Sequence, residues 1–247
     1  MNILKLFADY PFIPSFLDSG KEITDIVYDS RKARPDTIFV AMRGANRDGH
    51  DSCMNAYENG CRDFVVEHRV TLPNDAITYL VADSRRALSV MSRSLFQFTP
   101  KEEKKLVPTQ LIAVTGTKGK TSTCMILRSI LEAAGRKVGY IGTLGVMYDG
   151  KVLETPNTTP ESYEIFRHLR QMRLSGCEYV LIEASSQGVK LHRTADLCFN
   201  LGVFTNLSPD HIGPGEHESF EEYLACKREL FSQCALSIGN IDDEYYE

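Results

Sequence analysis

Residues 114–123 read VTGTKGKTST and join a short apolar run to a helical one. A glycine-rich turn between a buried strand and a helix N-terminus points several backbone N–H groups at one position, where the helix dipole adds positive potential. Gly116 and Gly119 let the backbone approach an anion closely. Lys120 can reach the β- and γ-phosphates of a nucleotide, and the Thr121 hydroxyl can hold Mg²⁺. The spacing G-x-x-G-K-T is shorter than the common phosphate loop, because Val114 stands where the outer glycine would be.

The loop lies at the start of a regular alternation of strands and helices. One of the helices carries an apolar stripe that includes Ile130. Such alternation is typical of a mainly parallel sheet with helices on its faces. Using hydrophobic periodicity and capping signals, we expect strands at 111–115, 137–143, 178–184, 199–206 and 235–240, and helices at 121–134, 159–176 and 219–231.

The first part of the chain has a different texture. Four short strand-like runs are expected at 23–28, 37–41, 63–67 and 77–81, and the clearest helix follows Asp83-Ser84, with an apolar face that extends to Phe98. The segment TPKEEKKLVPT, 99–109, is charged, flanked by prolines and free of periodicity, which favours an interdomain linker. We therefore expect an α/β protein, with a small N-terminal α/β domain at 1–105 and a P-loop-type, mainly parallel α/β domain at 106–247.

Composition excludes some classes of function. The 247 residues carry a net charge of −5, which argues against a broad nucleic-acid surface. No apolar run is long enough to span a bilayer, and the N-terminus, with an early lysine followed by acid and proline, does not resemble a signal peptide. The seven cysteines form no Cys-x-x-Cys pair, so we expect reduced thiols in a cytoplasmic protein rather than a zinc site.

Two residues outside the loop are candidate metal ligands. EYVLIEASSQG places Glu183 at the C-terminal end of a buried strand, where α/β sheets bind ligands, and a carboxylate there can complete the coordination of Mg²⁺. Taken alone, such an acid is better explained by contact with solvent. His211 in TNLSPDH is either a ligand or an ordinary loop histidine, and in isolation the second interpretation is favoured.

Together these segments resemble one family. TGTKGKTS, NTTP at 157–160, EASSQGVKLHR at 183–193, TNLSPDH at 205–211 and EEYLACKREL at 221–230 occur in the order found in the Mur ligases. The segment YDSRKARPDTIFVAMRGANRDGH, 28–50, is similar to the uridine-nucleotide domain of the branch that adds the third residue of the peptidoglycan stem peptide. The resemblance covers nearly the whole chain.

The resemblance implies a reaction and its partners. An ATP-dependent ligase would form an amide bond between UDP-MurNAc-L-Ala-D-Glu and an amino acid, either lysine or diaminopimelate. The substrate carboxylate would attack the γ-phosphate of ATP to give an acyl phosphate, and the amine would then displace phosphate. Mg²⁺ and the loop would offset the repulsion between the anionic groups. The resemblance implies a monomer that acts in the cytoplasm.

The resemblance also implies a role for each matching residue. ATP would lie on the loop residues Gly116, Thr117, Lys118, Gly119, Lys120, Thr121 and Ser122. Thr121 and Glu183 would hold a first Mg²⁺, His211 would help hold a second, and Lys227 would be a further metal ligand. Catalysis would depend on Lys120, Glu183, His211 and Lys227. The acyl substrate would contact Asn157, Thr158, Thr159, Ser185 and Arg193, and the uridine nucleotide would contact Ser30, Ala45, Asn46 and Arg47.

Lys227 matches a family lysine that CO₂ converts to a carbamate. This modification turns a cation into a carboxylate-like ligand, whereas an ammonium group beside Mg²⁺ would be repelled. Helical periodicity alone instead predicts a solvated lysine on an amphipathic helix.

Three features depart from the family pattern. Gln187 stands where the family usually has histidine, so a proton-transfer role there is not supported. The loop at 212–217 differs from the family sequence. The family also continues beyond position 247 with a domain that holds the amino-acid pocket, so we expect the C-terminal ligase domain to be absent and ligation by this chain alone to be weak or absent.

Two alternatives remain open. A folylpolyglutamate-synthase-like ligase would share the loop, but the DSR and DGH segments near the N-terminus argue against it. A non-catalytic nucleotide-binding module would keep the loop without the chemistry.

Overall fold

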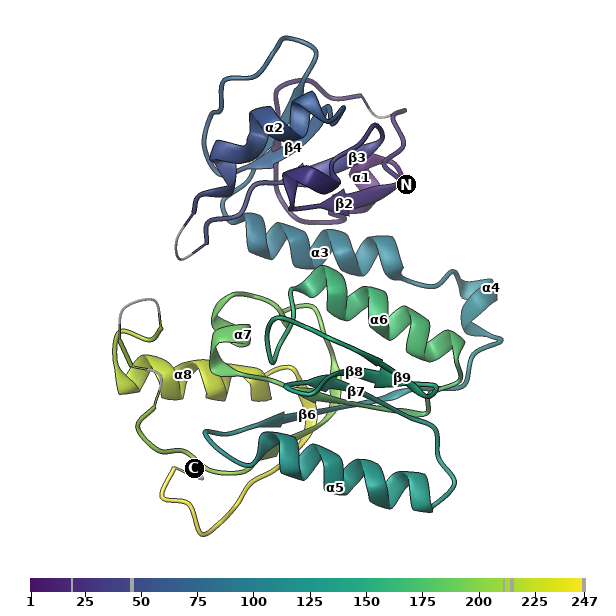
Figure 1. The fold of residues 1–247 in the computed structure, drawn as a ribbon, viewed down its shortest axis with the longest axis vertical. Coiled ribbons are helices and arrows are strands. Elements are labelled where there is room, and N and C mark those ends of the chain that lie inside the picture. Colours follow the sequence, from purple (N-terminus) through teal and green to yellow (C-terminus); the bar gives the residue numbers. More distant parts are fainter. Residues whose placement is uncertain (19, 45–46, 211, 214–215, 246–247) are drawn as a thin grey trace. The chain divides into compact units, whose positions relative to one another are not determined.

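The computed structural model describes residues 1–18, 20–44, 47–210, 212–213 and 216–245. The chain forms two compact units, Met1–Gln97 and Phe98–Glu247 (Figure 1). Each unit is built on its own sheet, in which most neighbouring strands run parallel and helices cover the faces. The mixed α/β class that the alternation predicted is therefore confirmed.

The first unit holds a five-stranded sheet in the order β1-β5-β4-β3-β2, in which only the short β1 runs antiparallel. The Asp83 carboxylate caps the longest helix by accepting a hydrogen bond from Arg86 N–H. Helix α2, Cys53–Glu58, packs over Phe39 and Phe64 on the opposite face of the sheet. The elements are α1 Ile3–Phe7, β1 Ile13–Pro14, β2 Asp25–Val27, β3 Thr37–Val40, α2 Cys53–Glu58, β4 Asp63–Val66, β5 Ile77–Leu80 and α3 Ser84–Phe96.

The second unit holds a seven-stranded sheet in the order β12-β11-β6-β10-β7-β8-β9. The alternation predicted the five parallel strands, but not the antiparallel β8 and β9, which extend one edge. The elements are α4 Pro100–Glu103, β6 Gln110–Thr115, α5 Lys120–Ala133, β7 Val138–Gly142, β8 Gly145–Tyr148, β9 Lys151–Leu153, α6 Ser162–Leu174, β10 Tyr179–Glu183, α7 Ser186–Lys190, β11 Phe199–Phe204, α8 Phe220–Phe231 and β12 Cys234–Ile238.

Helices cover both faces of the second sheet. In Figure 1, α5 lies on one face, and α6, α7 and α8 lie on the other. Successive strand residues alternate between these faces: Ala113 and Ile182 pack toward α6, while Val114 and Leu181 pack with Cys124 of α5. Burial on both faces explains why the central strands read as continuous apolar runs.

The charged segment after α3 is folded rather than extended. It contains α4, whose Thr99–Glu102 capping box is complete, and Glu102 and Glu103 form ion pairs with Arg170 and Arg173 of α6 at 2.9 and 2.6 Å. Phe98, expected on the apolar face of the preceding helix, instead lies under the two guanidinium groups. The segment therefore belongs to the second compact unit, Phe98–Glu247.

Two helix details also differ from the sequence-based expectation. Ile130 was expected on the buried stripe of its helix, but 59% of its surface is exposed, because α5 covers the sheet mainly through Cys124, Leu127 and Leu131. Helix α6 begins at Ser162, not at residue 159, because Thr159 has turned inward to bond with the end of β10.

Candidate active site

The loop between β6 and α5 depends on its glycines. Gly116 has φ +148° and Gly119 has φ +84°, and a Cβ at Gly116 would lie 1.9 Å from Thr205 Oγ1. No other residue fits there without moving the end of β11. Gly119 caps α5, so the first-turn N–H groups, which a helix cannot bond internally, open onto the loop.

Residues that follow β11 hold the loop in place. Asn206 accepts a hydrogen bond from Lys118 N–H at 2.9 Å and donates its amide to Lys118 O at 3.0 Å. Thr205 Oγ1 donates to the same carbonyl at 2.7 Å. Sequence reasoning used TNLSPDH only for its histidine and missed this pair, although parallel β6 and β11 necessarily end at the same edge of the sheet.

The Lys120 ammonium group folds back over the loop. It donates to Gly116 O at 2.8 Å and to Thr117 O at 3.0 Å. Burial lowers the pKa of Lys120, and the negative charge of Glu183 opposes that shift. The lysine therefore lies in the loop with Glu183 close enough to act on it electrostatically.

Glu183 is fully buried at the end of β10 and accepts four hydrogen bonds. Oε2 accepts from the Thr121 hydroxyl at 3.0 Å and from the Thr143 hydroxyl at 3.1 Å. Oε1 accepts from the Tyr140 hydroxyl and from Thr143 N–H. Among the described residues, no cationic side chain lies within ion-pair distance of this carboxylate. Oxygen ligands from Thr121 and Glu183 thus meet at one point, a donor set that suits Mg²⁺.

Lys227 is the second charged group buried near the loop. Only 2% of it is exposed, although periodicity alone predicted a solvated side chain. Burial lowers the pKa of Lys227 from its ordinary value of 10.5 to about 7; the nearby Lys120 lowers it further, and Asp210 opposes the shift. Its Nζ lies 4.6 Å from the centre of the Tyr223 ring and, within the described part of the chain, has no hydrogen-bond partner.

The helix that carries Lys227 is tied directly to the loop. The Tyr223 hydroxyl lies 2.9 Å from Thr117 Oγ1, which also accepts from Ser208 N–H at 3.0 Å. Thr117 was expected to contact ATP, but its hydroxyl is committed to these protein groups. The contact between Thr117 and Tyr223 therefore fixes α8, and with it Lys227, relative to the loop. Lys227 also lines a cavity of about 440 Å³ between α8 and the end of β12.

The residues expected to bind the acyl substrate gather beside Glu183. Thr159 Oγ1 donates to Glu183 O at 2.8 Å and accepts from Ser185 N–H at 3.0 Å. Arg193 donates to Thr159 O at 3.0 Å and pairs with Glu161 at 2.8 Å, so it orders this turn.

The remaining members of that set lie nearby along the chain. Thr158 Oγ1 lies 3.1 Å from Thr143 Oγ1, which itself bonds Glu183. Asn157 is exposed, and its backbone carbonyl accepts from the Thr155 hydroxyl.

Two of the residues expected to contact ATP, Lys118 and Ser122, are also exposed, on either side of Gly119 at the loop.

The first unit carries the residues expected to contact uridine. Ser30 O accepts from the Asn59 side chain, and Arg47 is exposed. Gly44 N–H donates to Arg47 O at 2.8 Å. Ala45 and Asn46, like His211 in the second unit, lie outside the described residues.

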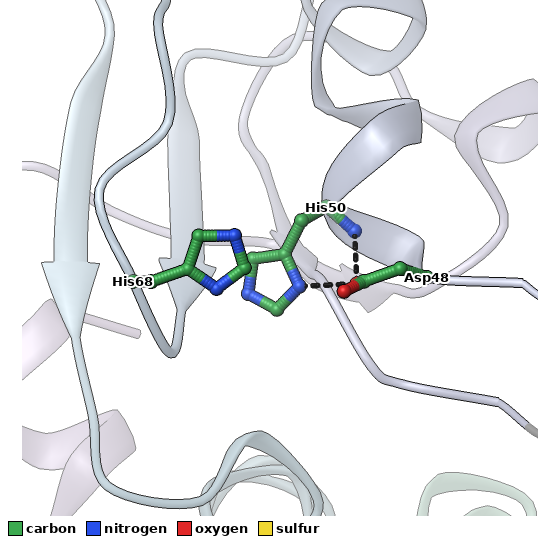
Figure 2. Close-up of side chains that lie close together, drawn as sticks. All are labelled: Asp48, His50 and His68. Carbon is green, nitrogen blue, oxygen red and sulfur yellow. Dashed lines mark hydrogen bonds and ion pairs between the residues drawn. The ribbon is translucent and has the colours of Figure 1, made fainter.

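The first unit also contains a cluster of two histidines and an aspartate. Figure 2 shows Asp48, His50 and His68, whose side chains are close enough to be considered as metal ligands. His50 Nε2 accepts from Glu67 N–H at 2.9 Å, so its Nδ1 carries the proton and donates to Asp48 at 2.5 Å. Arg43 Nη2 lies 3.5 Å from His68 Nδ1. Because both nitrogens of His50 are committed and a guanidinium group lies alongside, the cluster fits a structural role better than a metal site.

Comparison with known proteins places the chain in a family. The Mur ligase middle domain matches residues 114–247, and the Mur ligase family, catalytic domain, matches residues 22–101. The chain belongs to the Mur ligase family. This membership confirms the resemblance drawn from the loop and the segments around it.

Curated relatives of this Mur ligase chain are about twice its length. It is 37% identical over 237 residues to UDP-N-acetylmuramoyl-L-alanyl-D-glutamate–2,6-diaminopimelate ligase of Clostridium perfringens, covering 96% of this chain and 47% of the relative. The enzyme of the same name from Clostridium botulinum is 36% identical, with 100% and 50% covered. The chain thus spans about half the length of the curated relatives it matches.

Solved structures show the same fold. A structure of UDP-N-acetylmuramoyl-L-alanyl-D-glutamate–2,6-diaminopimelate ligase superposes with a TM-score of 0.81 at 23% identity, covering 100% of this chain and 48% of the other. MurF ligase from Thermotoga maritima in complex with ADP superposes with a TM-score of 0.55 at 20% identity, covering 90% and 46%. In the described part of this Mur ligase chain, every helix is too short or too polar to cross a membrane.

Proposed function

We propose that this chain binds ATP and a UDP-linked peptide precursor as part of an ATP-dependent ligase of peptidoglycan synthesis. The observation that carries the proposal is the convergence of Lys120, Thr121 and Glu183 on the loop between β6 and α5. The curated relatives are named as ligases that act on UDP-N-acetylmuramoyl-L-alanyl-D-glutamate, which supports the same substrate here. Their names also make diaminopimelate the amino acid to test before lysine.

ATP would bind with its phosphates against the first turn of α5, at Gly119–Ser122. Lys120 would leave the carbonyls of Gly116 and Thr117 and bind phosphate oxygens instead. The Thr121 hydroxyl and Glu183 Oε2, 3.0 Å apart, fit a divalent cation because both are hard oxygen ligands. Bound Mg²⁺ would supply positive charge that offsets the repulsion between the phosphates and a carboxylate substrate.

The chain's own groups would then position the reactants. Loop N–H groups and Lys120 would stabilise the charge that moves onto ADP as the substrate carboxylate attacks the γ-phosphate. The products of that step are an acyl phosphate and ADP. In the second step the amine of the amino acid forms the amide bond to the acyl carbon and phosphate leaves. Thr158, Thr159 and Ser185 beside Glu183 would hold the acyl group close to the nucleotide.

Lys227 would act as a carbamate. With a pKa of about 7, much of the Lys227 side chain is a neutral amine near neutral pH. The lone pair of Nζ can attack the carbon of CO₂, form an N–C bond and release a proton, which gives an anionic carbamate. Lys227 and His211 would complete the metal ligands. Carbon NMR with ¹³CO₂ would detect the carbamate signal in the unmodified chain and its loss in Lys227→Met.

Each unit carries its own set of expected substrate contacts. Ser30, Ala45, Asn46 and Arg47 of the first unit would contact the uridine nucleotide. Asn157 and Arg193 of the second unit would contact the peptide part, and Arg193 would share its guanidinium between the substrate and Glu161. In the same proposal the protein acts in the cytoplasm, where ATP and UDP-linked precursors are found, and as a monomer.

A substrate-dependence assay tests the proposal. The full chain is mixed with ATP, Mg²⁺ and either UDP-MurNAc-L-Ala-D-Glu or UDP-MurNAc-L-Ala, and ADP is measured with and without diaminopimelate. We expect calorimetric binding of the D-Glu precursor that is tighter than binding of the precursor without D-Glu, and we expect any ADP formation, even if weak, only with the D-Glu precursor. Equal binding of the two precursors, or no binding of either, would contradict the proposal.

A further inference from the structure

Tyr140 reaches the carboxylate of Glu183 from the neighbouring strand. Strands β7 and β10 are parallel and adjacent, and Tyr140 lies opposite Leu181. Because alternate residues share a face, Tyr140 lies on the same face of the sheet as Glu183, two residues further from the C-terminal ends of the strands. Its hydroxyl donates to Glu183 Oε1, and both side chains are fully buried. The hydroxyl also accepts from Leu144 N–H at 3.3 Å, which fixes its direction.

Gly142 makes this reach possible. It lies two residues after Tyr140 on the same face of β7, directly over the path of the tyrosine side chain. A Cβ at this position would lie 2.2 Å from the Tyr140 hydroxyl oxygen and 2.5 Å from Glu183 Oε1. Any side chain at position 142 would push the two groups apart, so the hydrogen bond between Tyr140 and Glu183 requires the glycine.

The two oxygens of Glu183 are held in different ways. Oε1 is bonded by the Tyr140 hydroxyl and by a backbone N–H of Thr143 at 3.3 Å, which cannot rotate. Among the described residues, Oε2 is bonded only by the hydroxyls of Thr121 and Thr143. These hydroxyls can turn their protons away and leave lone pairs facing a cation. Oε2 is therefore the oxygen that is available.

We propose that Tyr140, with Gly142, is a positioning residue that presents Glu183 Oε2 alone to the divalent cation and thereby favours Mg²⁺ over Ca²⁺. This inference rests on the proposed nucleotide site. Mg²⁺ is small and demands regular geometry, whereas Ca²⁺ accepts carboxylates through one or both oxygens and tolerates irregular sites. When the protein holds one oxygen of the carboxylate, coordination of Ca²⁺ through both oxygens is disfavoured.

The test compares Tyr140→Phe with the unmodified chain. Binding of AMP-PNP is measured by calorimetry while Mg²⁺ or Ca²⁺ is titrated, and the ratio of the two half-saturating concentrations is the readout. Loss of a hydrogen bond to a metal-binding residue typically changes metal affinity by about 10- to 100-fold. We expect the preference for Mg²⁺ to fall about 10-fold in Tyr140→Phe, mainly through weaker Mg²⁺ binding.

Tyr79→Phe is the matched control. It removes a buried tyrosine hydroxyl that also donates to a buried carboxylate, Asp63, in the first unit. It should lose comparable stability but keep the cation preference of the unmodified chain. Thermal unfolding and binding of AMP-PNP without metal check that each variant is folded.

Two results would overturn the inference, and they are distinguishable. If Tyr140→Phe kept the unmodified preference while Glu183→Gln lost metal dependence, the nucleotide site would stand and Tyr140 would be only structural. If the unmodified chain showed no cation-dependent binding of AMP-PNP, the proposed function would fail and the inference with it.

Discussion

Each unit of the chain buries one carboxylate under a tyrosine hydroxyl. Asp63 in the first unit accepts from Tyr79, and Glu183 in the second accepts from Tyr140. Both carboxylates are at most 1% exposed. Asp63 forms a 2.6 Å ion pair with Lys21, whereas Glu183 has no ion pair among the described residues.

The difference separates a structural carboxylate from a functional one. Asp63 begins β4 and so lies at the N-terminal ends of the parallel strands, whereas parallel sheets bind ligands at the C-terminal ends. Its charge is neutralised by Lys21. Glu183 ends β10 beside the phosphate loop, and its donors orient the charge without neutralising it. A buried carboxylate that is hydrogen-bonded but not paired with a cation is a costly arrangement, and a bound cation would relieve that cost.

Glu183→Gln should have the largest effect on nucleotide binding. The amide keeps the shape of the side chain but removes the charge, so Mg²⁺-dependent binding of AMP-PNP should weaken by at least about 100-fold. The free energy of unfolding without metal should not fall, because a buried charge that has no ion-pair partner among the described residues is removed. Calorimetry measures the binding and urea denaturation measures the stability. A loss of stability with metal binding intact would show that Glu183 is a structural carboxylate.

Asp63→Asn should show the opposite pattern. Lys21 would lose its partner, and the free energy of unfolding should fall by about 2 kcal/mol. Cation-dependent binding of AMP-PNP should match that of the unmodified chain. Urea denaturation gives the first value and calorimetry the second; weakened Mg²⁺ dependence would show that the two carboxylates are not separable in this way.

Lys227→Met extends the comparison to a buried cation. The pKa of Lys227 falls from 10.5 in the unfolded chain to about 7 in the folded protein. Between these values only the unfolded chain binds the proton, so the free energy of unfolding rises with pH from about 7 to 10.5. Lys227→Met should lack this rise, and between pH 7 and pH 9 the unmodified chain should gain about 2 kcal/mol relative to it.

Urea denaturation in CO₂-free buffer at several pH values checks this difference. Taking the difference between the two chains removes the contributions of the other titrating groups. Parallel stability curves for the two chains would contradict the lowered pKa.

Thr143→Val should have the smallest effect of the four. It removes one of the two hydroxyls on Glu183 Oε2 and leaves the Thr121 hydroxyl and the backbone N–H of residue 143. The half-saturating Mg²⁺ concentration for AMP-PNP binding should rise about fivefold, below the usual range for such partners, because a second donor remains. Thr143→Ser retains the hydroxyl and should match the unmodified chain; equal loss in both variants would indicate a packing effect instead.

Local patterns predicted the parts of the site that neighbouring residues determine. The loop at 114–123 and the strand end at Glu183 were found because glycine spacing and apolar runs are features of sequence. Tyr140 and Thr143 were missed because their role depends on β7 lying next to β10, and strand order cannot be read from periodicity. Periodicity alone placed Lys227 in solvent, because a charged residue on a helix gives no local sign of what packs against it; only the resemblance singled out this lysine.

The most direct test of the central claim is a crystal structure of the chain with AMP-PNP and Mn²⁺, in which anomalous scattering locates the metal. We expect a metal peak bound by Thr121 Oγ1 and Glu183 Oε2, with Lys120 moved from the loop carbonyls to the phosphates. A nucleotide bound elsewhere, or a metal peak away from Glu183 while Thr121 remains bonded to the carboxylate, would contradict it.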